Sequence, residues 1–199
     1  MRILVGPVPR DLPIAFIACA TLLITLAVVK PVRAHELDLS LNDNAFRVSY
    51  AAVLRDNLRL DGGWLRDDDE GDVFHAGFQV TGDAAPGDQK MTAGVGVRLA
   101  LLDGDGDNRE GYALGIGGSV RWAIPRYNRF AVYGEYYWAP DILSGGDAEK
   151  YVDGTIRLGY SVTPQAEIYI GARYTGADFD NRPSILFDTG MHAGIDLRF

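Results

Sequence analysis

Cysteine is nearly absent from this chain of 199 residues, because Cys19 is its single thiol. One cysteine excludes a disulfide framework and a multi-cysteine metal site. Basic residues are also few: 19 lysines and arginines stand against 27 aspartates and glutamates, for a net charge of −8. An acidic chain without a basic face is not a general nucleic-acid-binding protein, so we expect no nucleic-acid partner.

The chain also lacks an apolar run long enough for a membrane-spanning helix. Residues 14–29 form its main uncharged apolar stretch, which is shorter than the roughly 20 residues of a spanning helix. Arg2 and Arg10 precede this stretch, and Ala34 ends a short segment of suitable residues for cleavage after it. This layout is typical of a secretory signal peptide. We therefore expect residues 1–34 to be a cleaved signal peptide and residues 35–199 to form one domain.

Helical periodicity is missing after residue 35, where apolar residues recur at every second position instead. The alternation is clearest in residues 91–101, 114–122 and 191–199. Most alternating segments have about 9–11 residues or slightly more, the length of a tilted membrane strand rather than of a soluble one. The sequence predicts an all-β fold, an antiparallel up-and-down transmembrane β-barrel of about ten strands. Eight strands stay open as an alternative, because the first hairpin is short.

We expect the polar face of these strands to point into the barrel. It mixes glycine with arginines and acids in near balance, whereas a soluble surface would more often use lysine, which occurs only at Lys30, Lys90 and Lys150. Unpaired charge in a narrow lumen is costly, so the charges should pair and fill it. The candidate lumen network consists of Arg47, Arg59, Asp61, Arg98, Arg121, Glu135, Asp153, Arg157, Glu167, Arg173, Asp196 and Arg198, with Asp38 on the same face.

Aromatic residues and connection lengths indicate two different ends of the barrel. One expected girdle contains Trp64, Tyr112, Trp138, Tyr151 and Tyr174, and the other contains Trp122, Phe130, Tyr160 and Phe199. Connections 67–72, 103–111, 139–149 and 177–186 are long or acidic, whereas 55–56, 125–128 and 163–166 are short. Acidic extracellular loops and short periplasmic turns would give this pattern.

The final strand predicts both a location and partners. Phe199 ends a fully alternating strand, which resembles the C-terminal signal that the barrel-assembly machinery of bacteria recognises. We therefore expect the protein in the bacterial outer membrane, where outer-membrane lipid and lipopolysaccharide would surround it. The oligomeric state stays open.

Four segments of the chain resemble the YfaZ-like outer-membrane protein family. They are Glu36–Arg47, Gly63–Val73, Tyr136–Ser144 and Pro164–Gly171. The likeness extends over nearly the whole mature chain and depends on the order of the segments rather than on one motif. The resemblance implies an outer-membrane β-barrel of largely unassigned function, and it supplies no catalytic residues.

One acidic segment has the spacing of a possible cation site. Asp103, Asp105, Asp107 and Glu110 alternate with glycine in a pattern that suits a hard cation such as Ca²⁺. The pattern departs from an EF-hand, because Asn108 occupies the glycine position and no helices flank the segment. A solvated acidic loop is the alternative, and we expect no other cofactor.

Catalytic residues are scarce on the polar face. His75 and His192 point inward with Ser49, Ser119 and Ser161, but none of the serines lies in a Gly-x-Ser-x-Gly elbow. We therefore expect no enzymatic activity and favour a barrel with a filled lumen. A narrow porin-like channel for small solutes or ions is the main alternative, and a lipid-modifying enzyme is a weaker one.

Overall fold

The computed structural model describes residues 34–199 apart from 56, 86–89, 106–108 and 181–182. The expected signal peptide therefore lies outside the described residues except for Ala34. The elements in chain order are β1 (Ala34–Leu41), β2 (Ala45–Arg55), β3 (Leu58–Asp67), β4 (Gly71–Asp83), β5 (Met91–Gly104), β6 (Glu110–Ala123), β7 (Phe130–Ala139), the 3-10 helix η1 (Asp141–Leu143), β8 (Ser144–Gly146), β9 (Ala148–Thr163), β10 (Ala166–Phe179) and β11 (Ile185–Arg198). No helix in this described part has the length and hydropathy needed to cross a membrane.

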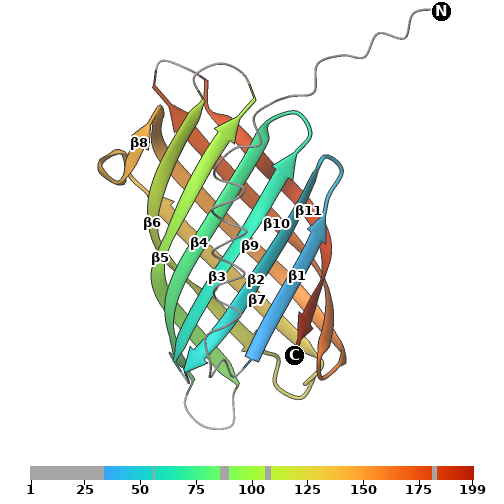
Figure 1. The fold of residues 1–199 in the computed structure, drawn as a ribbon. Helices are drawn as coiled ribbons and strands as arrows, with labels where there is room; N and C mark the ends of the chain where they lie inside the picture. Colours follow the sequence, from blue (N-terminus) through green and yellow to red (C-terminus); the bar gives the residue numbers. More distant parts are fainter. Residues whose placement is uncertain (1–33, 56, 86–89, 106–108, 181–182) are drawn as a thin grey trace, which may run out of the picture. The chain divides into compact units, whose positions relative to one another are not determined.

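Antiparallel pairing of neighbours closes these strands into a barrel (Figure 1). The first and last strands meet through pairs such as Leu37↔Leu197, and β5 pairs with β6 on the opposite side of the ring. The short β8 pairs with β6 beyond the end of β7, so β7 and β8 share one position in the wall. The ring described here has 10 strand positions, which confirms the all-β up-and-down barrel and favours ten strands over eight.

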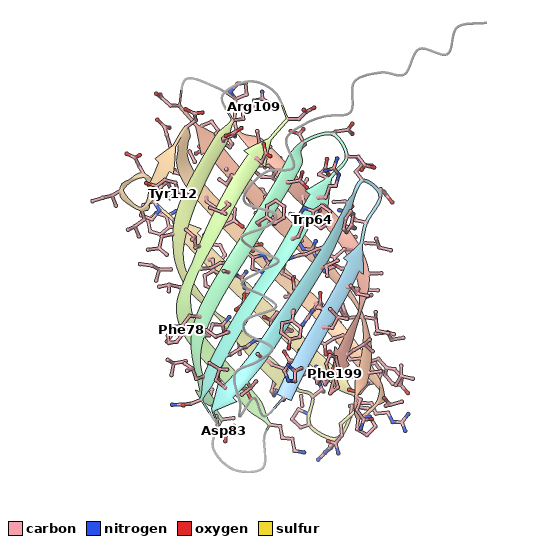
Figure 2. All side chains as sticks on the ribbon, in the orientation of Figure 1. Trp64, Phe78, Asp83, Arg109, Tyr112 and Phe199 are labelled. Carbon is pink, nitrogen blue, oxygen red and sulfur yellow. The ribbon has the colours of Figure 1, made fainter. Side chains whose placement is uncertain are left out.

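The apolar face of the strands points outward and the polar face points inward, as predicted. Val95 is 71% exposed and Ile156 is 59% exposed, although both are aliphatic, whereas Arg98 is only 2% exposed. Figure 2 shows Phe78 projecting away from the wall in the same manner. This distribution is the reverse of a soluble barrel and matches a barrel whose outer surface faces lipid.

The two ends of the barrel differ in their connections. We call the end with connections 42–44, 68–70, 105–109, 140–147 and 180–184 the loop end, and the end with connections 56–57, 84–90, 124–129 and 164–165 the turn end. Arg109 marks the loop end in Figure 2, and Asp83 and Phe199 lie toward the turn end. The acidic connections predicted from the sequence therefore share one end.

An apolar plug fills the loop end of the lumen, and the sequence analysis did not anticipate it. Its side chains are buried and come from the strand segments next to the loops. They are Ala45, Leu65, Val73, Ala100, Leu102, Ala113, Ala139, Ala148, Tyr151, Ala177, Phe179, Ile185 and Phe187. Tyr151 was expected in an outer girdle, and this was wrong: it is 1% exposed, because it shares its inward parity with Asp153.

The plug depends on strand segments that were expected to be loop. Residues 177–186 were predicted as a connection, but β10 continues to Phe179 and β11 begins at Ile185. A bulge in the β10–β11 ladder shifts the register between Thr175 and Gly176. The extra residue on β11 reverses the alternation once, which directs an additional apolar side chain into the lumen.

Two inward glycines allow the wall to curve tightly between β4 and β7. Gly96 and Gly117 face each other across β5 and β6. A Cβ at Gly96 would collide with the carbonyl oxygen of Phe78, and a Cβ at Gly117 would collide with that of Tyr136. Close approach of neighbouring backbones therefore requires glycine at both positions.

Candidate functional site

Arg98 on β5 is the centre of the charged lumen. Its guanidinium donates to Glu135 Oε1 at 2.7 Å, to Asp153 Oδ2 at 2.9 Å and to Asp61 Oδ2 at 3.0 Å. The guanidinium also lies over the ring of Tyr137, 4.1 Å from its centroid. One cation therefore joins three carboxylates from β3, β7 and β9.

Asp153 receives donors from two further strands. Arg47 on β2 contacts its two oxygens at 3.4 and 3.2 Å, and Thr175 on β10 donates to Oδ1 at 3.1 Å. Both side chains of the Arg47–Asp153 ion pair are buried. Because Asp153 accepts from Arg47, Arg98 and Thr175 together, its charge is fully engaged across the barrel.

A second cluster is built around Arg157 on β9. Its guanidinium donates to Asp38 and lies 3.8 Å from Asp196 Oδ2. The same group lies between the rings of Tyr133 and Tyr169, at 4.3 and 4.5 Å from their centroids. The planar guanidinium thus combines ion pairing with stacking, which lysine would not reproduce.

A third cluster lies just below the apolar plug. Arg173 donates to Asp188 Oδ2 and to Ser40 Oγ, both at 2.6 Å. Asp188 also accepts from the side-chain amide of Asn42 at 2.5 Å. This cluster ties β1 and β10 to the bulged part of β11.

The turn end of the lumen is more open to solvent. Arg121 makes two hydrogen bonds to Glu167, at 3.1 and 2.6 Å, and its side chain is 30% exposed. Arg198 is equally exposed and lies 3.5 Å from the same carboxylate, while Arg59 pairs with Glu36 at 2.9 Å. The lumen therefore changes from dry at the loop end to partly wet at the turn end.

Every residue of the predicted lumen network takes part in an inward ion pair. Two partners were missed. Glu36 continues the alternation of Asp38 and Ser40, so the parity of β1 was a usable signal. Asp188 was missed because the expected final strand started at Gly190.

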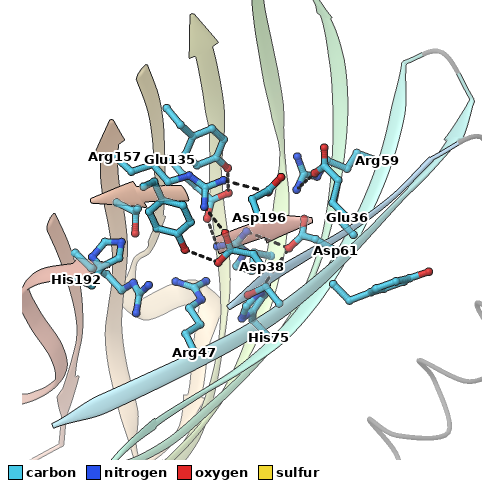
Figure 3. A pocket seen from close by; sticks show the side chains of 18 residues that line it. Glu36, Asp38, Arg47, Arg59, Asp61, His75, Glu135, Arg157, His192 and Asp196 are labelled. Atoms are coloured by element: carbon cyan, nitrogen blue, oxygen red, sulfur yellow. Dashed lines mark hydrogen bonds and ion pairs between the residues drawn. The ribbon is translucent and has the colours of Figure 1, made fainter. Parts of the chain in front are cut away.

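The space left between these clusters is small. A cavity of about 60 Å³ lies among them, and its lining includes His75, His192 and Thr155 (Figure 3). This volume admits a few water molecules but no organic substrate. His192 packs edge-on against Tyr169, and neither of its ring nitrogens has a hydrogen-bond partner.

Three of the polar groups considered for an enzyme, His75, Ser119 and Ser161, contact other side chains of the lumen. His75 Nε2 lies 3.6 Å from Asp61 Oδ2 within the Arg98 cluster. Ser119 donates to Gln79 at 2.8 Å, and Ser161 contacts Glu167 at 3.4 Å.

The candidate cation segment lies at the loop end. Asp103 and Glu110 are paired strand residues, Asp105 belongs to the loop, and Asp107 is outside the described residues. Within the residues that are described, no group of three or more histidine, cysteine or acidic side chains is arranged to hold a metal ion. A Ca²⁺ site that includes Asp107 stays a prediction.

Comparison with known proteins identifies the family of the chain. The family described as "YfaZ precursor" matches residues 14–199. The chain is similar to "Outer membrane protein YfaZ" of Escherichia coli (strain K12), with 34% identity over 145 residues that cover 71% of this chain and 75% of that protein. A solved structure titled "Unveiling the Mechanism Behind the in-meso Crystallization of Membrane Proteins" matches with a TM-score of 0.39 and 11% identity, over 83% of this chain and 82% of the other. The chain therefore belongs to the YfaZ family and is a β-barrel protein of the bacterial outer membrane.

Proposed function

We propose that this barrel is a non-conducting structural or interaction protein rather than a channel or an enzyme. The proposal depends on one observation: two obstructions follow one another along the lumen. The apolar plug closes the loop end, and the network around Arg98 and Asp153 fills the middle. An ion on this path would meet a dry constriction and then a set of neutralised charges.

Planar-bilayer recording of the refolded protein tests this proposal directly. We expect no discrete conductance steps from the wild type at any salt concentration. The double variant Phe179→Ala/Phe187→Ala removes two large plug side chains and should introduce steps or a leak. Its matched control is Leu186→Ala, because Leu186 is a neighbouring apolar residue that is 42% exposed on the outer face. Discrete steps from the wild type would overturn the proposal in favour of a narrow channel.

We further propose that the acidic loop end shares divalent cations with lipopolysaccharide. Asp72, Asp103 and Glu110 lie in register on β4, β5 and β6, with outward parity. Trp64 Nε1 donates to Asp72 Oδ1 at 2.6 Å and Arg66 donates to its Oδ2 at 3.0 Å, which orients this carboxylate at the end of the row. Carboxylates at this level suit Mg²⁺ or Ca²⁺ bridged to lipid phosphates.

The cation-sharing proposal is tested by thermal unfolding with purified lipopolysaccharide in the presence of Mg²⁺ or a chelator. We expect lipopolysaccharide to raise the unfolding temperature only when Mg²⁺ is present. The variant Asp103→Asn/Glu110→Gln should lose this effect, and Asp43→Asn, in the β1–β2 loop, should retain it. Equal stabilisation with the chelator would contradict a role for divalent cations.

A further inference from the structure

β11 extends beyond its partner β1 at the loop end. The β1–β11 ladder ends at the pair Leu41↔Ala193, whereas β11 begins at Ile185. On the other side, β10 pairs with β11 up to Ile185. Within the described strands, the edge of β11 from Ile185 to His192 therefore has one neighbour only. An unpaired strand edge is a template for another extended chain.

The first hairpin stops early because of Asn42. Its side-chain oxygen accepts the backbone N–H groups of Asn44 and Ala45, at 3.0 and 2.5 Å, and closes the turn. Its side-chain amide donates to Asp188 and anchors the turn against β11. The β1–β2 hairpin thus ends at Leu41 and Ala45, while β11 beside β1 continues toward the loop end.

A hollow of about 530 Å³ occupies the space above this hairpin, and we call it the notch. Its lining comes from the β1–β2 turn, the end of β3 and the turn after it, and the edge of β11 around Gly190. A Cβ added to Gly190 would meet nothing within 4 Å, so the space reaches the strand itself. The volume suits a few residues of extended polypeptide.

The negative charge of the notch indicates which kind of polypeptide segment would bind there. Asp43, Asp69 and Glu70 line it together with Asp67, and among the lining residues that the structure describes there is no lysine or arginine. Met191 is 68% exposed and adds an apolar contact. Pairing between two copies of this chain would bring like charges together, which is unfavourable. A basic extended segment would form hydrogen bonds with the unpaired edge of β11, and its positive charges would pair with the carboxylates.

Only part of the β11 edge belongs to a continuous ladder with β10, and this part limits the length of an added strand. The bulge skips Phe187 in the ladder with β10, but residues 188–192 pair with β10 without interruption. Strand addition therefore has a short, continuously paired segment over residues 188–192, in which Gly190 departs from regular strand geometry with a φ of 122°. We propose that the notch binds an extended polypeptide segment carrying lysine or arginine, which adds to β11 as a short strand.

Fluorescence anisotropy with a labelled Lys-Val-Lys-Val-Lys-Val peptide tests this inference on the refolded full chain, with protein-free micelles as the blank. A peptide of the same sequence, N-methylated at alternate residues, keeps the charge but loses the strand hydrogen bonds. We expect binding to the unmodified peptide that N-methylation weakens by about tenfold. Equal binding of the two peptides would show charge adsorption alone and overturn strand addition.

Two protein variants separate the notch from the acidic row on β4–β6. Asp69→Asn/Glu70→Gln should weaken binding of the unmodified peptide by about five- to tenfold, because two facing carboxylates are lost. The matched control Asp103→Asn/Glu110→Gln removes two carboxylates at the same end and should change binding by less than about twofold. Equal losses in both variants, or no loss in the first, would overturn the assignment to the notch.

Discussion

Phe187 and Asp188 are adjacent in the chain, yet both side chains point into the lumen. Phe187 is 0% exposed within the apolar plug, and Asp188 is 2% exposed beside Arg173. Regular alternation would place one of them in lipid. The bulge opposite Thr175 and Gly176 places both inside, so this irregularity joins the apolar plug to the charged network.

The first prediction concerns Phe187. Replacing it with alanine leaves a cavity in the packed plug, so the free energy of unfolding should fall by about 3–5 kcal/mol. Urea unfolding in detergent micelles measures this change. Leu186→Ala is the control, and its cost should be below about 1.5 kcal/mol because the side chain is 42% exposed and leaves no closed cavity when it is removed. Similar losses in the two variants would mean that the plug is not tightly packed.

The second prediction concerns Asp153. The substitution Asp153→Asn leaves Arg47 and Arg98 short of a buried carboxylate, so we expect a loss of about 3–5 kcal/mol in unfolding free energy. Asp178→Asn provides a contrast, since the Lys150–Asp178 contact of 3.7 Å is exposed. That variant should cost no more than about 1 kcal/mol. A small effect at Asp153 would mean that water replaces the missing charge.

The third prediction concerns the curvature of the wall. Gly96→Val would drive a side chain into the backbone of β4, so we expect little folded protein on unboiled gels. Gly82→Val is its matched control on an adjacent strand, because a Cβ there meets nothing within 4 Å. Normal folding of Gly96→Val would contradict the close approach of β4 and β5.

The fourth prediction tests which face meets lipid. Val97 is outward on β5 and 41% exposed. Val97→Arg should destabilise the barrel in lipid vesicles by about 2–4 kcal/mol, because the charge enters the apolar band. Tyr127→Arg, at a turn position that is 66% exposed, should have an effect of about 0–1 kcal/mol. Equal tolerance at both sites would mean that Val97 is not in contact with lipid.

Strand parity carried most of what could be predicted from the sequence. Because side chains alternate strictly, the facing of Arg98 and Asp153 followed from their neighbours Val97 and Val152. The same alternation would have predicted that Glu36 points inward, but this residue at the start of β1 was overlooked. Parity was not applied to Phe187 and Asp188, because the expected final strand started at Gly190, and the bulge that turns both inward arises from the fit between β10 and β11.

The apolar plug was missed for a related reason. Tyr151, Phe179 and Ile185 lie where strands run past the expected ends, and apolar residues near acidic loops indicate a membrane girdle as readily as an interior. The distinction depends on which strand segments continue to pair. Pair identities inside the lumen were equally out of reach, since Arg157 meets Asp38 from a position 119 residues away in the chain.

The pairing of β1 with β11 also sets an order of events in time. The ring stays open until β11 is available, so Glu36 on β1 can meet Arg198 on β11 only after the last strand has been made. Before closure, a polar inner surface that is buried in the finished barrel would face its surroundings without these partners. Contacts so distant in sequence form slowly. Closure of the ring, which pairs β1 with β11 and brings Glu36 to Arg198, is therefore expected to be a late step of folding.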